Sequence, residues 1–146
     1  MNNDARKEFI LKAAEESSHL RRTMAESLAT PLLELADIIS GVIGSGGKIL
    51  ICGNGGSAAD SSHIAAEMIV RLTSQRTRQS LPALALNADT AVMTAAGNDF
   101  GFEQIFARQV EGLGNKGDLL LLISTSGNSA NLLRAAEMAH HKGLRT

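Results

Sequence analysis

Two short polar segments contain most of the residues that could bind an anion. The first is Gly53–Ser57 and the second is Ser124–Ser129. Each follows an apolar run that predicts a buried strand, at 48–52 and 118–123, and each precedes a run that predicts a helix. Backbone N–H groups and hydroxyls in such a turn point at one spot beside a helix N-terminus, which favours a phosphate. Two such turns in one sheet predict one phosphorylated ligand held from two sides.

Each segment has an alternative interpretation. Gly53, Gly55 and Ala58 match the G-x-G-x-x-A pattern of dinucleotide-binding loops, but the acidic residue expected about 20 positions later is replaced by the basic stretch at 76–79. No G-K-[S/T] follows, which excludes a Walker-type loop. The second segment could be an ordinary turn that caps the next helix. This segment has four hydroxyl side chains, those of Ser124, Thr125, Ser126 and Ser129. Four hydroxyls are more than one helix cap needs, which favours phosphate binding.

His63 and Glu67 lie four residues apart on a helix predicted at 59–72, so they share a face of that helix. An imidazole and a carboxylate at this spacing could ligate a metal ion, or Glu67 could serve as a general base. A solvated His–Glu pair is the plain alternative. Two ligands alone leave a zinc site incomplete.

Two further candidates stand next to glycines. Asn98 and Asp99 could hydrogen-bond sugar hydroxyls, or simply form the turn at 97–101. Cys52 ends the first predicted strand, where a free cysteine is more often a small buried hydrophobe than a nucleophile.

Composition narrows the class of protein. The 146 residues are 44% hydrophobic with a net charge of -1, which indicates one globular domain. Aromatic residues make up only 3%, and there is no basic surplus, so a nucleic-acid partner is not expected. No signal-peptide pattern and no uninterrupted apolar span of about 20 residues is visible, so we expect a cytoplasmic protein that does not enter a membrane.

The periodicity predicts a single α/β domain over 1–146. Residues 1–46 contain two helices, one at 4–28 and one that begins with Thr30 as its N-cap and Pro31 in its first turn. Their apolar faces need cover from the sheet or from partner chains. Residues 47–146 form the α/β core, a three-layer parallel sheet with helices on both faces. Its strands are expected at 48–52, 84–86 and 118–123, and its helices at 59–72, 90–96, 102–113 and 130–141.

Residues 144–146 read as the entry to a further strand. We therefore expect that the last strands and a C-terminal helix of this domain are missing from the sequence.

Four motifs occur in a specific order: 52–60 together with His63 and Glu67, then 81–83, 97–103 and 123–129. Together they resemble the phosphoheptose isomerases (sedoheptulose 7-phosphate isomerases) of the sugar isomerase, or SIS, fold family. The resemblance runs from about Thr30 to Thr146. It implies a homotetramer with active sites between subunits, one zinc ion per subunit, and a ketose–aldose isomerisation that supplies heptose for lipopolysaccharide.

The resemblance also implies roles for individual residues. Glu67 and His63 would be catalytic and would ligate zinc, with Glu67 moving a proton between C1 and C2. The substrate would contact Asn54, Gly55, Gly56, Glu67, Asn98, Asp99, Ser124, Thr125, Ser126 and Ser129. In the family a Gln and a His of a final helix complete the zinc site, and nothing up to Thr146 matches them. We therefore expect the 146-residue chain to be inactive or only weakly active.

The alternative is a non-catalytic member of the same fold family, which binds a sugar phosphate or regulates replication initiation. Glu67 argues against it, because a binding-only protein has no need of a carboxylate there.

Overall fold

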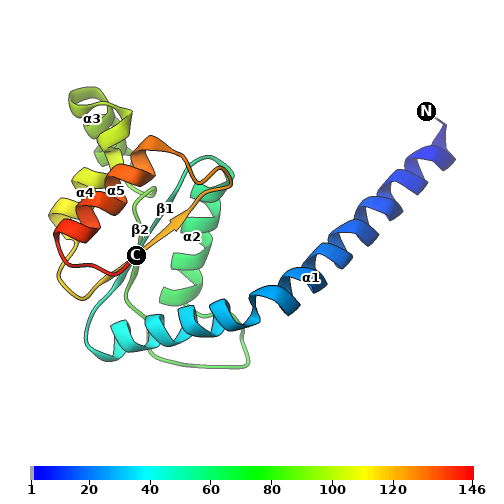
Figure 1. The fold of residues 1–146 in the computed structure, drawn as a ribbon, viewed down its shortest axis with the longest axis horizontal. Coiled ribbons are helices and arrows are strands. Elements are labelled where there is room, and N and C mark those ends of the chain that lie inside the picture. The colour runs from blue at the N-terminus through cyan, green and yellow to red at the C-terminus, as the bar shows by residue number, and fades with distance from the viewer. Residues whose placement is uncertain (1) are drawn as a thin grey trace. The chain divides into compact units, whose positions relative to one another are not determined.

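Three parallel strands form the central sheet of the unit that comprises residues 39–146. The computed structural model describes residues 2–146, which divide into two units, one ending at Ile38 and one comprising Ile39–Thr146. The strands lie in the order β2-β1-β3. In chain order the elements are α1 (Asn3–Gly44), β1 (Ile49–Gly53), α2 (Gly56–Ile69), β2 (Ala83–Ala85), α3 (Thr90–Phe100), the 3-10 helix η1 (Phe102–Gln104), α4 (Ile105–Leu113), β3 (Leu119–Ile123) and α5 (Ala130–His141) (Figure 1).

β1 is apolar up to its last residue because it is the central strand. Ile49 pairs with Ala83 on one side and with Leu119 on the other, and all five residues of β1 are buried. A strand covered on both faces has no solvent side on which to place polar residues. The predicted strands and their parallel arrangement are confirmed.

The chain returns to the sheet after α5. Arg145 forms a parallel bridge with Leu119, and the N–H of Leu120 donates to the carbonyl oxygen of Arg145 at 2.8 Å. The predicted extended segment at 144–146 therefore lies beside β3.

Helices cover both faces of the sheet, as predicted. α2 lies on one side, and α4 and α5 lie on the other (Figure 1). Alternate residues of a strand point to opposite faces. Leu50, Cys52 and Leu120 accordingly share one core cluster with Phe106 of α4 and Ala135 of α5. The result is the predicted three-layer α/β architecture.

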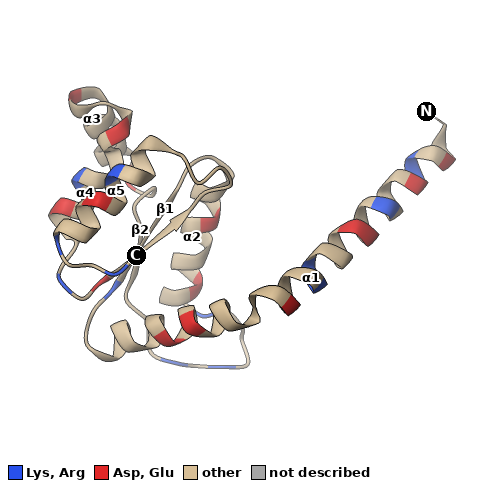
Figure 2. Ribbon diagram, viewed as in Figure 1, with Lys and Arg blue, Asp and Glu red and all other residues tan. Residues whose placement is uncertain are grey.

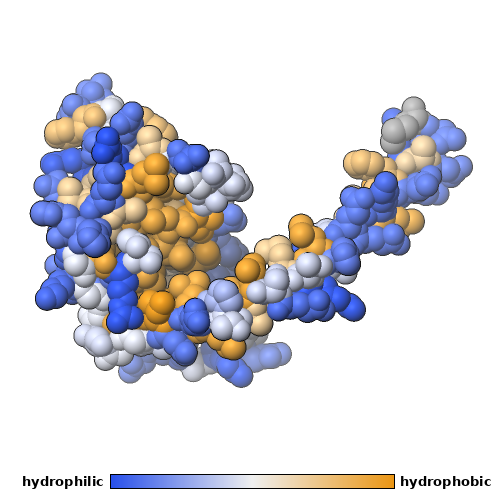
Figure 3. All heavy atoms as spheres, in the orientation of Figure 1, coloured by the Kyte–Doolittle hydropathy of each residue, from blue (hydrophilic) through white to orange (hydrophobic). Residues whose placement is uncertain are grey.

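The carboxyl half of β3 is less well covered than the rest of the sheet. Leu119 and Leu120 are buried, whereas the three residues that follow, up to Ile123, are only partly buried. Figure 3 shows apolar side chains gathered in this area, between α2 and α5.

The amino-terminal end of β3 is held by a buried carboxylate. Asp118 is 3% exposed, pairs with the Lys48 ammonium and accepts the backbone N–H groups of Lys48 and Asn115. Burial alone would raise the pKa of Asp118, but these hydrogen bonds and the Lys48 charge outweigh it and hold that pKa below its usual range.

The predicted break between two N-terminal helices is wrong. α1 is one helix from Asn3 to Gly44, with Pro31 inside it. Proline removes one N–H and crowds the preceding turn, which kinks a helix without always ending it. Good helix formers on both sides, such as Leu28 and Leu35, carry the helix past this position.

Among the described helices, α1 is the one that is long and apolar enough to cross a membrane by length and composition. Length and composition alone do not identify a membrane span, because core helices of soluble proteins and N-terminal signal sequences meet the same criterion.

Candidate functional site

The two predicted anion-binding loops meet at the carboxyl ends of β1 and β3. They line a small pocket of about 60 Å³, which we call the cradle. Parallel strands bring the loops that follow them to the same edge of the sheet, so neighbouring strands produce neighbouring loops. The lining residues are Asn54 and Ser57 from the first loop and Ile123, Ser124, Thr125, Ser126 and Ser129 from the second.

The first loop turns tightly because Gly53 has no side chain. A Cβ at Gly53 would lie 2.7 Å from both the Cβ and the carbonyl oxygen of Ser57. The same segment is held by two hydrogen bonds: Asn87 Nδ2 donates to the Gly53 carbonyl at 2.7 Å, and Ser61 Oγ donates to the Ser57 carbonyl at 2.7 Å. α2 can therefore begin at Gly56, directly above the end of β1.

The second loop is shaped by hydrogen bonds to its own hydroxyls. Gly127 adopts φ +67°, and its N–H donates to Ser124 Oγ at 3.0 Å. The N–H of Asn128 donates to Ser126 Oγ at 3.2 Å. A hydroxyl that accepts a hydrogen bond keeps its own hydrogen for another partner. Ser124 Oγ and Ser126 Oγ also lie 3.4 Å apart and share one hydrogen bond, so one of the two hydroxyl hydrogens remains for an anion in the cradle while that bond is kept.

Ser129 separates the anion-binding interpretation from the plain cap interpretation. It is the N-cap residue of α5, yet its side chain makes no capping hydrogen bond. Its backbone carbonyl accepts the N–H groups of Leu132 and Leu133, as in any helix start. The hydroxyl is thus free of the role that the plain interpretation assigns to it, and it lines the cradle instead.

One residue near the cradle was not anticipated. Ser57, which ends the predicted first loop but was not among the predicted substrate contacts, lines the cradle. The unanticipated residue is Asn131, in the first turn of α5, which is hydrogen-bonded to Asn54 in both directions, each at 2.9 Å. Asn131 is only 2% exposed. A polar residue on the same face of a helix as Leu132 and Ala135 was the signal that could have found it.

His63 and Glu67 lie together on α2, as predicted. His63 Nε2 is 3.7 Å from Glu67 Oε1, and the Glu67 side chain is 29% exposed. Glu67 Oε2 is buried and has no hydrogen-bond partner among residues 2–146. A buried carboxylate oxygen without a partner is costly, so this oxygen is available to accept a hydrogen bond or to bind a cation.

This pair lines a second pocket, of about 440 Å³, which we call the His–Glu pocket; its other residues are Ile64, Met68, Leu72 and Arg78. It shares no residue with the cradle. Glu67 follows Ser57 by ten positions on α2, which corresponds to about 15 Å along a helix axis.

The donor set fits part of a zinc site. An imidazole nitrogen and a carboxylate oxygen are ordinary zinc ligands, and the unpartnered Oε2 gives Glu67 a further acceptor. No group of three or more His, Cys, Asp or Glu side chains able to hold a metal ion occurs within residues 2–146. The described part of the chain therefore offers two donors for such a site, His63 and Glu67.

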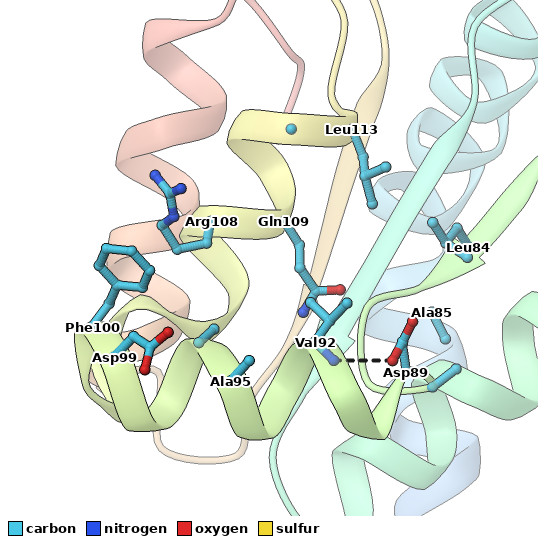
Figure 4. Close-up of a pocket in the computed structure, with 13 residues that line it drawn as sticks. Leu84, Ala85, Asp89, Val92, Ala95, Asp99, Phe100, Arg108, Gln109 and Leu113 are labelled. Atoms are coloured by element: carbon cyan, nitrogen blue, oxygen red, sulfur yellow. Dashed lines mark hydrogen bonds between the residues drawn. The ribbon is translucent and has the colours of Figure 1, made fainter.

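Asn98 and Asp99 do not line the cradle. They belong to the last turn of α3, which runs on to Phe100, so the turn considered at 97–101 is helical for most of its length. Asn98 Nδ2 donates to Asp99 Oδ1 at 2.8 Å. Asp99 lines a third pocket, of about 540 Å³, between α3 and α4 (Figure 4). Apolar side chains such as Val92 and Leu113 make up most of that pocket.

The remaining predicted residues support the cradle or lie outside it. Gly55 precedes α2 as its N-cap residue and Gly56 opens the helix, so both connect the two cradle residues of the first loop.

Cys52 is fully buried, and burial raises the pKa of its thiol to about 12. A thiol held neutral in this way is a poor nucleophile, which agrees with its interpretation as a core residue.

The family model and two relatives similar in sequence point to the same family of proteins. The SIS domain family model matches residues 14–146. The chain is 50% identical over 144 residues to a phosphoheptose isomerase of Desulfovibrio desulfuricans, covering 99% of this chain and 68% of the relative. It is 49% identical to one of Methylibium petroleiphilum, covering 88% of this chain and 64% of the relative. The chain thus spans about two thirds of the length of these relatives.

Two solved structures that resemble this chain are also of phosphoheptose isomerases. The phosphoheptose isomerase GmhA of Neisseria gonorrhoeae is 41% identical with a TM-score of 0.86, and the match covers 94% of this chain and 71% of that one. A phosphoheptose isomerase of Francisella tularensis is 39% identical with a TM-score of 0.88, at the same two coverages.

Proposed function

The chain belongs to the SIS domain family, and from that premise we propose that it acts as a phosphoheptose isomerase, converting sedoheptulose 7-phosphate to D-glycero-D-manno-heptose 7-phosphate. The observation that carries the proposal is the cradle. Its Ser129 hydroxyl is released from helix capping and lines a small polar pocket with the first loop. Such a pocket suits the phosphate of a sugar phosphate, with the sugar extending away from it.

The cradle binds without a formal charge. No Lys or Arg lines it, so the phosphate would be held by hydroxyls, the Asn54 amide and the N-terminal ends of α2 and α5. Helix N-termini carry a partial positive charge that favours an anion. Neutral, fixed donors hold a phosphate in one orientation, which is what positioning of C1 and C2 requires.

Glu67 is proposed as the base that moves the proton between the two carbons. Its carboxylate takes a proton from C1 of the ketose, which leaves an enediolate, and delivers a proton to C2 to give the aldose. While the carboxyl group holds the proton, it can exchange with solvent. The hydroxyl proton moves from O1 to O2 through a second acid–base group, which the family resemblance assigns to a His on a final helix. The unpartnered Oε2 of Glu67 is the oxygen with lone pairs available for this work.

Zinc is part of the proposal, one ion per subunit. His63 Nε2 and Glu67 Oε1, 3.7 Å apart, would contribute two of its ligands. When bound, zinc would supply a Lewis acid that polarises the substrate carbonyl. The two Glu67 oxygens then have separate tasks, since Oε1 faces His63 and Oε2 remains for the proton.

The proposed setting is a cytoplasmic homotetramer that supplies heptose for lipopolysaccharide. Active sites between subunits are supported by the separation of the cradle from the His–Glu pocket along α2. A substrate held in one chain's cradle could then meet the His–Glu pocket of another chain.

The test compares sedoheptulose 7-phosphate with unphosphorylated sedoheptulose. Binding is measured by calorimetry, and conversion by NMR in D2O, where the enediolate step places solvent deuterium on carbon. We expect the phosphorylated sugar to bind at least about tenfold tighter, which one charge-assisted hydrogen bond suffices to produce, and deuterium to enter at C2 of the aldose. Equal affinity for both sugars would contradict the phosphate site. Tight binding with neither conversion nor exchange, in a form of the protein that carries the complete set of zinc ligands, would favour a non-catalytic SIS protein.

A further inference from the structure

Asn131 is a buried amide with a single partner. It lies in the first turn of α5, two residues after Ser129, and is 2% exposed. A buried amide needs hydrogen bonds to offset the loss of water. Asn131 Nδ2 donates to Asn54 Oδ1 and Asn131 Oδ1 accepts from Asn54 Nδ2, each at 2.9 Å. The two side chains therefore satisfy each other head to head.

This pair joins the two loops of the cradle. Asn54 belongs to the first loop and lines the cradle, while Asn131 stands on the helix that the second loop begins. Beyond the strand pairing that ends at Gly53 and Ile123, no other hydrogen bond joins residues 54–57 to residues 124–131 in the described part of the chain. Beyond the strand pairing, this amide pair is thus the hydrogen-bonded link between the two sets of donors.

The Asn54 side chain has little freedom once it is paired. Its amide uses one donor and its acceptor on Asn131, which leaves one N–H for a ligand. The orientation of that remaining donor is fixed by the pair. Loss of Asn131 would free the Asn54 amide to rotate, and would also leave it partly buried without its partner.

We propose that Asn131 is a positioning residue of the phosphate cradle, which acts through Asn54 to hold the glycine loop and the serine loop at the spacing that one phosphate requires. This rests on the proposed phosphate site. Asn131 does not line the cradle, so its effect on a ligand passes through Asn54.

The test uses inorganic phosphate as the probe and Asn131→Leu as the main variant. Leucine has a similar volume and can form neither hydrogen bond. Phosphate affinity is measured by NMR titration, with each protein held well below its own unfolding midpoint. We expect Asn131→Leu to weaken phosphate binding at least tenfold while the circular dichroism spectrum stays that of the folded protein.

Asp118→Asn is the matched control. Asp118 is also buried and hydrogen-bonded, but it stands at the opposite end of β3 from the cradle. It should lower the unfolding midpoint and leave phosphate affinity within twofold of the unsubstituted protein. If Asn131→Leu does not fold, Asn131→Ser replaces it, since serine is shorter and tolerates water in the space. A double variant with Asn54→Ala should bind no more weakly than the weaker single variant, because the two side chains act as one unit.

The outcomes separate the two proposals. A folded Asn131 variant that binds phosphate within twofold of the unsubstituted protein overturns the positioning role and leaves the phosphate site intact. Additive losses in the double variant overturn it as well. Failure of the unsubstituted protein to bind phosphate or the sugar phosphate overturns the phosphate site, and the positioning role with it.

Discussion

The cradle and the His–Glu pocket are built in opposite ways. The cradle takes its residues from two loops and orders them with backbone turns, hydroxyl hydrogen bonds and one amide pair. The His–Glu pocket takes its two reactive groups from one face of one helix. The cradle is lined by hydroxyls and an amide, several of which are hydrogen-bonded. The His–Glu pocket leaves Glu67 Oε2 buried with no hydrogen-bond partner among residues 2–146.

Charge divides the two regions in the same way. Figure 2 shows no charged residue on the loops that follow β1 and β3, whereas α2 carries Glu67 in its last turns. Binding by neutral fixed dipoles changes little with pH, while a carboxylate and an imidazole can exchange protons. Under the proposed function, binding of the substrate and its conversion would therefore fall to two different kinds of structure.

The largest effect is expected from Glu67→Gln. The amide keeps the shape of the side chain but cannot accept the proton, so turnover of sedoheptulose 7-phosphate should fall about 10²–10⁴-fold in a form of the protein that is active. Phosphate affinity should not change, because Glu67 does not line the cradle. Glu137→Gln, an exposed pair partner of Arg134 on α5, is the control. Undiminished turnover in Glu67→Gln would remove the proposed base.

Gly53→Ala should damage the cradle before the His–Glu pocket. The added Cβ would meet the Ser57 backbone at 2.7 Å, so the start of α2 must shift, at a cost of about 1–3 kcal/mol of folding free energy. Chemical denaturation gives the stability and phosphate titration gives the affinity. An alanine variant with normal stability and normal phosphate binding would show that the close approach at Gly53 is not required.

Ser129→Ala should weaken phosphate binding about tenfold with little loss of stability, because its hydroxyl is not used as a helix cap. Ser62→Ala, on an exposed part of α2 that lines neither site, is the control. A stability loss of about 1 kcal/mol with unchanged phosphate affinity would restore the plain cap interpretation.

The smallest effect on ligand binding concerns Asp118, which lies at the opposite end of β3 from the cradle and acts on stability alone. Its pKa in the folded protein is lowered, so its contribution to stability is present above the unfolded pKa of about 3.9 and is lost as the pH falls through the folded value. Asp118→Asn should cost about 1–3 kcal/mol at pH 7 and flatten the loss of stability in acid. Denaturation curves between pH 2 and 7 measure both. A variant with an unchanged acid profile would contradict the assigned charge pairing.

Much of the fold follows from sequence pattern alone. The all-apolar run at Leu119–Ile123 predicted a strand covered on two faces, and the alternation of strands with helices predicted the parallel sheet. The break at Thr30 and Pro31 was predicted from capping preference, which is local and weak. In the structure, α1 continues through these two residues as one helix.

The site was predictable where backbone turns decide it. Glycine and hydroxyl content identified both loops, and the parallel sheet brought them together. Asn131 was missed because its function depends on the distance between two loops 77 residues apart in sequence, which no local pattern encodes. The resemblance assigned Asn98 and Asp99 to the sugar. Asp99 lines the pocket between α3 and α4 (Figure 4), and the assignment to the sugar stays a prediction.

The most direct test of the account is an amide-resolved NMR titration of the protein with inorganic phosphate. The account predicts that the largest shifts occur together, with one affinity, in residues 54–57 and 124–129. Shifts confined to one loop, or centred on lysine-rich surface such as Lys116 and Lys142, would contradict the claim that the two loops form one phosphate site.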